Sequence, residues 1–311
     1  MVRENRNGLL WSLVYERPVA RHVDFIEKSP LYHVFPGSLS YSYGTAGCNF
    51  HCTFCYNADI AHPNKVLRAT EVQDVPPKEI VSESLEHECL SIAATYTEPT
   101  VFMEYVLDVA RLGRQNRLIQ TLVTNGFMTP RALKSLMPFL DAVNVNLKSL
   151  REDFYTQQCA ARLHPVLQSL RSLKKAGVWL EVTTLIIPGV NDSQDELKET
   201  AEFIASLGRE TPWHLTAFHP SYLLSNRPAT PMETLYRARE IGILSGLHYV
   251  YLGNVFQAEF KHTYCHQCGN KLIDRSSLTS VPVGLHHGNC AHCGQALPGL
   301  GMNWSEFSQS H

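Results

Sequence analysis

Three cysteines in a short segment have the side-chain type and the spacing to hold an iron–sulfur cluster. Cys48, Cys52 and Cys55 lie in the run Cys-Asn-Phe-His-Cys-Thr-Phe-Cys, which directly follows Gly44-Thr-Ala-Gly47. Three thiolates on one loop can ligate three irons of a [4Fe–4S] cluster. The fourth iron then lacks a protein ligand, and an open metal site of this kind can bind a small molecule.

S-adenosylmethionine (SAM) suits such an open iron, because its amino and carboxylate groups can chelate the metal. An electron from the cluster can then break the adjacent C–S bond and release a 5′-deoxyadenosyl radical, so the cofactors supply the difficult chemistry. A cluster with four local cysteine ligands is disfavoured, because no cysteine lies between Cys55 and Cys89. The alternative is a zinc site completed by His51 or by a distant cysteine.

A second group of cysteines near the C-terminus predicts a small metal-stapled module. It consists of two Cys-x-x-Cys pairs, Cys265 with Cys268 and Cys290 with Cys293, each followed by a glycine. Two such pairs separated by 21 residues are typical of a four-cysteine zinc ribbon. A closed tetrahedral site has no free coordination position, so a structural role is expected. An auxiliary iron–sulfur cluster is the alternative.

The composition sets broad limits on the class of protein. The chain has 311 residues, of which 44% are hydrophobic, enough for one large domain with a small appendage. A net charge of −2 without a basic run makes a nucleic-acid partner unexpected. Without a secretory signal or a long apolar run, we expect a soluble, cytoplasmic chain and no membrane association. The isolated Cys89 and Cys159 are expected to be small buried core residues.

Short apolar segments alternate with amphipathic segments over most of the chain. Strands are predicted at 40–45, 91–95, 119–124, 142–147, 180–187, 214–218 and 249–252, and helices at 79–89, 100–116, 130–138, 165–176, 195–208 and 231–245. This alternation is typical of an α/β fold with a parallel sheet, here a partial (β/α)6-type barrel. In barrels the functional groups lie at the C-terminal ends of the strands. We expect a lead-in at 1–38, the barrel at 39–260 and the zinc-ribbon-like module at 261–311.

The cysteine loop and several later motifs together resemble a known family. The motifs are Tyr96-Thr-Glu-Pro-Thr100, Val123-Thr-Asn-Gly126, Asn144-Val-Asn-Leu-Lys148, the segment 181–192 and Tyr249-Val-Tyr-Leu-Gly-Asn254. The cysteine loop resembles the signature of the radical SAM superfamily. With the other motifs in this order, the chain resembles the radical SAM enzymes of the AmmeMemoRadiSam system, which are similar to pyruvate formate-lyase activating enzymes.

The resemblance implies a radical SAM barrel with SAM lying across the strand ends. Glu98 would meet the methionine amino group, or act only as a carboxylate at a helix start. Lys148 would hold the carboxylate of SAM or of a substrate, or be an exposed loop lysine. Asn125 would contact SAM at the same mouth. Thr183 would meet the ribose or simply fill a strand, and Asn254 would contact SAM at the adenine end.

The resemblance leaves three readings of the activity open. In the first, the radical abstracts a hydrogen atom from a small molecule or peptide, together with AMMECR1-like and Memo-like proteins. In the second, the chain activates a glycyl radical enzyme. In the third, it is a non-catalytic iron–sulfur and zinc scaffold. Either enzyme would need a flavodoxin- or ferredoxin-like electron donor. Such family members often carry a Cys-rich segment before the motif that here begins at Val2, and this sequence does not include it.

Overall fold

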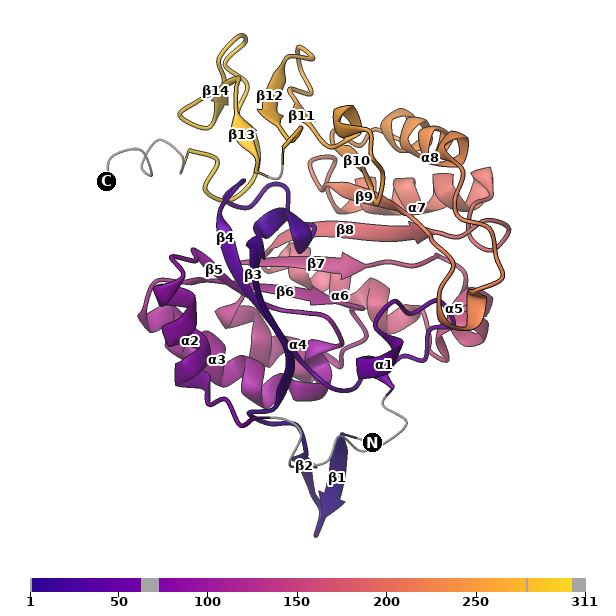
Figure 1. Ribbon diagram of the computed structural model, residues 1–311. Coiled ribbons are helices and arrows are strands. Elements are labelled where there is room, and N and C mark those ends of the chain that lie inside the picture. The colour runs from indigo at the N-terminus through magenta and orange to yellow at the C-terminus, as the bar shows by residue number, and fades with distance from the viewer. Residues whose placement is uncertain (1, 63–72, 278, 304–311) are drawn as a thin grey trace.

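A computed structural model describes residues 2–62, 73–277 and 279–303, and an eight-stranded curved sheet is its centre (Figure 1). The strands follow one another in the order β10-β9-β8-β7-β6-β5-β4-β3. Their bounds are β3 (Pro18–Phe25), β4 (Leu39–Thr45), β5 (Ser91–Ala94), β6 (Ile119–Thr124), β7 (Ala142–Asn146), β8 (Trp179–Ile186), β9 (Trp213–Ala217) and β10 (Val250–Gly253). From β4 to β10 all neighbours are parallel, which confirms the predicted barrel-type fold.

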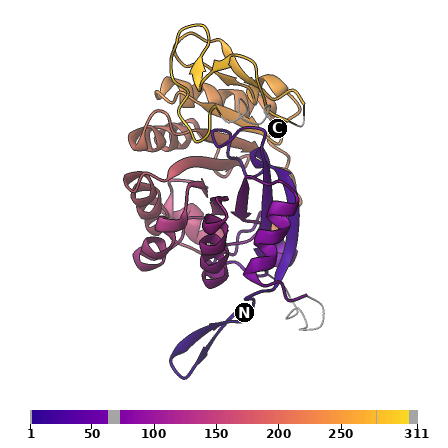
Figure 2. The same ribbon diagram turned by 90° about the vertical axis from the view of Figure 1, so that its left-hand side faces the viewer.

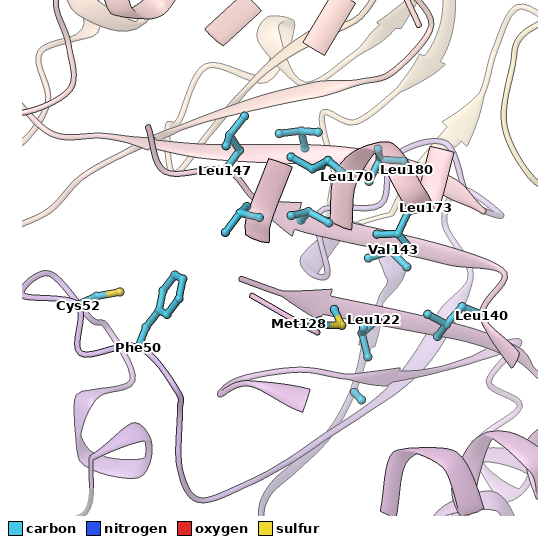
Figure 3. Packing of buried hydrophobic residues seen from close by; sticks show 14 of the residues in the cluster. Phe50, Cys52, Leu122, Met128, Leu140, Val143, Leu147, Leu170, Leu173 and Leu180 are labelled. Atoms are coloured by element: carbon cyan, nitrogen blue, oxygen red, sulfur yellow. The ribbon is translucent and has the colours of Figure 1, made fainter. Parts of the chain in front are cut away.

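Helices cover the outer face of this sheet (Figure 2). They are α2 (Pro77–Glu86), α3 (Met103–Gln115), α4 (Pro130–Leu136), α5 (Glu152–Cys159), α6 (His164–Lys175), α7 (Gln194–Leu207) and α8 (Met232–Leu244), with the short α1 (Ala58–Ala61) after the cysteine loop. The main hydrophobic core lies between strands and helices, where Leu122, Val143 and Leu170 are fully buried (Figure 3). The opposite, inward face of the strands is left with smaller and more polar side chains.

Every predicted strand is present, and its ends agree with the prediction to within one residue. Several elements were not predicted, and two of them help to build the sheet and the site. The segment 1–38 contributes β3 to the main sheet, where it pairs antiparallel with β4 and sets His22 opposite Ser42. The helix α5 was also missed, because its two large apolar residues, Phe154 and Tyr155, are adjacent rather than three or four apart.

The two edges of the sheet are β3 and β10, and these strands do not pair with each other within the described part of the chain. The barrel is therefore an open one. At one end of the molecule the hairpin β1 (Arg3–Arg6) and β2 (Leu9–Ser12) projects from the body (Figure 1). The C-terminal module lies at the other end, with strands β11 (Thr263–Tyr264), β12 (Lys271–Asp274), β13 (Val281–Pro282), β14 (Leu285–His286) and β15 (Asn289–Cys290).

A buried polar network attaches the C-terminal module to the barrel, at the end where the parallel strands begin. His33 bonds through Nε2 to the Tyr251 hydroxyl and through Nδ1 to the Pro298 carbonyl, each at 2.7 Å. The Arg275 guanidinium donates to the Tyr32 carbonyl at 2.8 Å and lies 4.3 Å from the centre of the Tyr32 ring. These contacts bring residues some 240 positions apart together and fix the module on the base of the barrel.

Among the described residues, no helix is both long enough and apolar enough to cross a bilayer.

Candidate active site

The cysteine loop begins directly at the C-terminal end of β4, where glycine is required twice. A Cβ at Gly44 would lie 2.3 Å from the Thr95 carbonyl oxygen, so only glycine lets β4 pass this close to its neighbour. Gly47 has a φ of +105° and turns the chain just before Cys48. Figure 3 shows Phe50, on the loop beside Cys52, with its ring directed toward the strands. Phe50 is 1% exposed and anchors the loop to the core.

The loop opens on a cavity of about 680 Å³ at the C-terminal ends of the strands. Sequence-predicted residues from separate parts of the chain meet on its wall. They are Cys48, Cys52, Cys55, Glu98, Asn125, Lys148 and Asn254. The volume is that of an ordinary small-molecule site. The structure therefore gathers all but one of the residues predicted at this mouth.

Asn125 links the end of β6 to the cysteine loop. Its Nδ2 donates to Asn49 Oδ1 at 2.7 Å and lies 3.8 Å from Cys48 Sγ. Its Oδ1 accepts the backbone N–H of Phe127 at 2.8 Å, and Asn49 Nδ2 donates back to the Phe127 carbonyl at 3.0 Å. This closed ring of hydrogen bonds fixes the loop beside Cys48. Asn49 was not predicted, because nothing in the sequence relates it to a residue 76 positions away.

Glu98 is buried at the end of β5, and protein donors already surround its carboxylate. Oε1 accepts from the backbone N–H and hydroxyl of Thr100 and from the Thr124 hydroxyl, while Oε2 accepts the Asn125 N–H at 2.8 Å. Burial nevertheless raises the pKa of Glu98. Oε2, with its single protein donor, can accept a further hydrogen bond from a ligand. Both predicted roles of Glu98 are thus compatible with its position.

Lys148 is partly buried just after β7, and its ammonium group interacts with the sulfurs of the loop cysteines. Its ammonium lies 5.4 Å from the centre of the Phe54 ring. Burial alone would lower the pKa of Lys148, but the sulfurs of Cys52 and the neighbouring cysteines raise it above its usual value. The lysine therefore stays charged and is not an exposed loop residue. A cation here can attract an anionic ligand group into the cavity.

Thr183 is not among the residues that line the cavity. It lies deeper in β8, and Leu185, two positions further along the same face, is on the wall together with Thr216 of β9. The Thr183 hydroxyl is buried and has no hydrogen-bond partner among the described residues. His214 also lies below the mouth, where it pairs with Glu181 at 2.6 Å.

Two cavity residues come from a strand that the sequence did not connect with the site. His22 and Asp24 reach the cavity from β3, and the His22 ring lies 5.8 Å from the ring of Tyr96, which also lines the cavity. Tyr96 has a φ of +66°, unusual for a residue with a side chain, and Asn57 Nδ2 donates to its carbonyl at 2.5 Å. The residues of β3 are mostly half-buried, so their sequence pattern carries no clear strand signal that could have revealed this wall.

The four C-terminal cysteines form a compact group that differs from the loop. Cys265 Sγ lies 3.6 Å from Cys293 Sγ, and Cys268 Sγ lies 3.6 Å from Cys290 Sγ. All four sulfurs are within 4.8 Å of one another, and no other such group occurs in the part of the chain that the structure describes. Four thiolates about 2.3 Å from one tetrahedral ion would be about 3.8 Å apart. The group therefore has the spacing of a single-ion site, whereas the loop cysteines are more widely spread.

Comparison with known proteins assigns the family. The model of the radical SAM superfamily matches residues 42–204, and the chain belongs to this superfamily. An uncharacterised protein of Methanocaldococcus jannaschii is 39% identical over 95% of this chain and 88% of its own. The pyruvate formate-lyase 1-activating enzyme of Escherichia coli (strain K12) is 22% identical over 56% of this chain and 71% of its own.

Solved structures show the same fold. Streptococcus suis SuiB bound to S-adenosylmethionine superposes with a TM-score of 0.56 at 14% sequence identity, over 78% of this chain and 56% of that one. Membership of the superfamily implies a [4Fe–4S] cluster and SAM as the cofactors. The residues on the cavity wall fit them, because the wall combines three separated thiols with a buried carboxylate and a charged lysine.

Proposed function

We propose that this chain is a radical SAM enzyme that holds a [4Fe–4S] cluster on Cys48, Cys52 and Cys55. The observation that carries the proposal is that these cysteines share one cavity with Glu98 and Lys148. When bound, the cluster supplies the electron that cleaves SAM into methionine and a 5′-deoxyadenosyl radical, which abstracts a hydrogen atom from the substrate. The wide spacing of the loop sulfurs favours a cluster over a single zinc ion.

Different cavity residues recognise different parts of SAM. Lys148 attracts its carboxylate and Glu98 Oε2 accepts from its amino group, so the two charged ends of the methionine part are matched. Asn125 holds Cys48 in place and borders the same space. Asn254, anchored through Nδ2 to the Ala217 carbonyl at 3.2 Å, borders the far side, where the adenine end would lie. Thr183 lies beneath this layer, and we assign it contact through water rather than directly to the ribose.

Two substrate classes remain consistent with this cavity. The similarity to a pyruvate formate-lyase activating enzyme favours a backbone glycine of a glycyl radical enzyme as the hydrogen donor. The motif pattern favours the AmmeMemoRadiSam system, with AMMECR1-like and Memo-like partners. A flavodoxin- or ferredoxin-like protein would deliver the electron in either case. Incubating the loaded enzyme with each candidate partner and testing for a glycyl radical by electron paramagnetic resonance (EPR) separates the two.

An anaerobic assay tests the proposed chemistry. The chain is reconstituted with iron and sulfide, its iron is counted, and 5′-deoxyadenosine is measured after SAM and dithionite are added. We expect about four irons at the loop and nucleoside release that Cys52→Ala abolishes. Cys89→Ala is the matched control, because Cys89 is also a buried cysteine but lies in the connection between α2 and β5 and does not line the cavity. A loaded cluster that releases no nucleoside, even with candidate partners present, would leave the non-catalytic scaffold as the correct reading.

We further propose that the C-terminal cysteines bind one structural zinc ion and that 261–303 is the module folded around it. The close tetrahedral spacing of the sulfurs supports zinc over an auxiliary cluster. The backbone N–H groups of Asn270 and Gln295 act on Cys268 and Cys293 to lower the pKa of these thiols, but burial and the neighbouring cysteines outweigh them and leave both pKa values raised. Gly269 and Gly294, with φ values of +75° and +77°, permit the turns that aim these N–H groups.

A further inference from the structure

The connection from β9 to α8 lies against the cysteine loop. The backbone N–H of Leu223 donates to the Thr53 carbonyl at 3.0 Å, and the N–H of His219 donates to the Tyr56 hydroxyl at 2.7 Å. Thr53 lies between the second and third cysteines of the loop, and Tyr56 directly follows the third. The connection is therefore attached to the residues that surround two of the three cluster thiols.

Three large side chains on these two segments are exposed, and we call them the loop patch. Tyr56, Tyr222 and Leu223 have 50%, 46% and 63% of their surface exposed. The latter two belong to the short 3-10 helix Tyr222–Leu224 and are not among the residues that line the cavity. Tyr222 also has a φ of +46°, which is unusual for an aromatic residue. Burial of the ring does not offset this strain, which indicates a functional reason for the exposed side chain.

The two segments that carry the loop patch contain no acidic residue. Residues 48–58 and 219–231 include His51, His219 and Arg227 but neither aspartate nor glutamate, although the whole chain has 29 acidic residues. A partner with a negatively charged contact face therefore meets no like charge on these segments. Complementary charge of this kind favours the encounter and suppresses unsuitable partners.

The size and position of the loop patch fit a transient electron-transfer partner. Aromatic residues are enriched at interfaces, but three exposed side chains are too few for a stable complex. Weak electron-transfer complexes, in contrast, bury less than about 1,200 Å². Tyr222 and Leu223 reach the cysteine loop without entering the cavity, so a protein seated on them can approach the loop while the cavity is occupied. A substrate would instead have to enter the cavity.

We propose that the loop patch is the docking surface for the electron donor, a small electron-transfer protein with an acidic contact face. The proposal rests on the proposed function of the cysteine loop, since a donor is needed only if a cluster is held there. One electron passes from the reduced donor to the oxidised cluster, and no bond forms or breaks in this step. The hydrogen bond from Leu223 to Thr53 joins the patch to the residue next to Cys52, which keeps the path short.

The test compares the wild-type chain with Tyr222→Asn, Leu223→Ser and the control Leu244→Ser, each reconstituted anaerobically. Asparagine tolerates positive φ, so Tyr222→Asn removes the ring without adding strain. Leu244 is also a largely exposed leucine, but it ends α8 on the side of the sheet where the strands begin. Release of 5′-deoxyadenosine is measured with dithionite, with reduced flavodoxin and with reduced ferredoxin. Binding is measured separately, by nuclear magnetic resonance titration of each isotope-labelled oxidised donor with the loaded chain.

Dithionite is a small molecule that needs no docking surface, so we expect all four proteins to release nucleoside with it at the same rate. With the donor protein that drives the wild type, we expect about tenfold lower release at equal donor concentration in Tyr222→Asn and Leu223→Ser. Donor binding should weaken by about the same factor. Leu244→Ser should match the wild type in both measurements.

Four outcomes would overturn the inference. The first is equal donor-driven release and equal donor binding in all four proteins. The second is a wild type that dithionite activates but that neither donor protein activates. The third is a matching loss with dithionite, which would make Tyr222 and Leu223 supports of the cysteine loop. The fourth is unchanged donor-driven release with lost modification of a candidate protein substrate, which would assign the patch to that substrate.

Failure of the proposed function gives a different result. A fully loaded wild type that releases no nucleoside even with dithionite would contradict the radical chemistry itself. A wild type that is active with dithionite, together with any of the four outcomes above, contradicts only the docking surface.

Discussion

The carboxylate of Glu98 accepts the backbone N–H of Asn125 at 2.8 Å, across the ends of two neighbouring parallel strands. The same Asn125 reaches the cysteine loop through its side chain. Hydrogen bonds thereby connect a buried carboxylate, the end of β6 and the cysteine loop. Disturbing one member should affect the others, and the variants below are chosen to separate their contributions.

Asn125→Ala should weaken the cysteine loop without removing a ligand. The substitution leaves Asn49 Oδ1 and the Phe127 N–H without their partner. We expect a loss of about 1–3 kcal/mol in the free energy of unfolding and lower iron loading. Chemical denaturation and iron analysis measure both. Asn116→Ala, at an exposed helix end, is the control, and equal effects of the two variants would contradict this role.

Lys148→Met should impair SAM binding more than cluster assembly. The variant removes the cation from the cavity but keeps an apolar side chain against Phe54. Loss of a charge-assisted hydrogen bond of about 1.5–3 kcal/mol corresponds to about a ten- to hundredfold higher Kd for SAM. The SAM-dependent change in the cluster EPR signal measures this constant. Lys134→Met on α4 serves as the matched control, and unaltered SAM affinity in Lys148→Met would refute the assignment.

Glu98→Gln tests whether the carboxylate stabilises the folded chain, binds SAM, or does both. The glutamine amide has an NH2 donor in place of one carboxylate oxygen. In one orientation this donor faces the Asn125 N–H, and in the other it faces the donors of Thr100 and Thr124, so a hydrogen bond is lost either way. We expect lower stability together with weaker SAM binding in the loaded enzyme. Thermal unfolding of the unloaded chain isolates the first effect. Lower stability with full SAM affinity would assign Glu98 to the strand ends alone.

Acid should loosen the junction between the barrel and the C-terminal module through His33. Burial lowers the pKa of His33 from 6.5 to about 4, against the raising influence of Glu181, while Arg275 and His214 lower it further. The folded state therefore binds this proton more weakly than the unfolded state. The contribution of neutral His33 to the free energy of unfolding is fully present above the unfolded pKa. It is lost as pH falls from about 6.5 toward 4, by up to about 3 kcal/mol.

Unfolding free energies measured across this range, in the wild type and in His33→Gln, check the prediction. The glutamine can still bond to the Tyr251 hydroxyl but does not titrate, so the variant should show a shallower pH dependence. Identical slopes in the two proteins would show that another group controls the acid loss.

Cys290→Ser should release the zinc ion and spare the loop cluster. Removal of one tetrahedral ligand weakens the site, and the metal contributes directly to folding of such modules. We expect zinc loss, unchanged iron and faster proteolysis within 261–303. Metal analysis of the reconstituted wild type provides the reference. About eight irons and no zinc would identify the C-terminal site as a second cluster.

The sequence predicted much of the fold because the parallel strands have strong local signals. Buried runs such as Ile119–Thr124 alternate with amphipathic helices, and each pattern is readable within a few residues. The strand β3 was missed because its residues are mostly half-buried at a sheet edge, where neither period is strong. The helix α5 was missed because its packing depends on the cysteine loop, which is more than 100 positions away.

In the candidate site, too, the sequence predicted features of short segments but not contacts between distant ones. Cysteine spacing predicted the loop, and strand ends predicted Glu98 and Lys148, since these are properties of short segments. The hydrogen bond between Asn125 and Asn49, and the bond from the His51 N–H to the Cys159 carbonyl, depend on how distant segments pack. The resemblance implied that Thr183 would meet the ribose, yet the depth of a residue along a strand depends on the stagger of the sheet.

The unpaired edges β3 and β10 leave a lateral gap in what would otherwise be a closed wall. A fully closed barrel can be reached by a substrate only from its ends. Here both flanks of the gap, through His22 and Asp24 of β3 on one side and Asn254 directly after β10 on the other, line the same cavity. A reactant tethered to a much larger body could therefore present one group from the side, so the bulk of a substrate need not be limited by the diameter of the barrel.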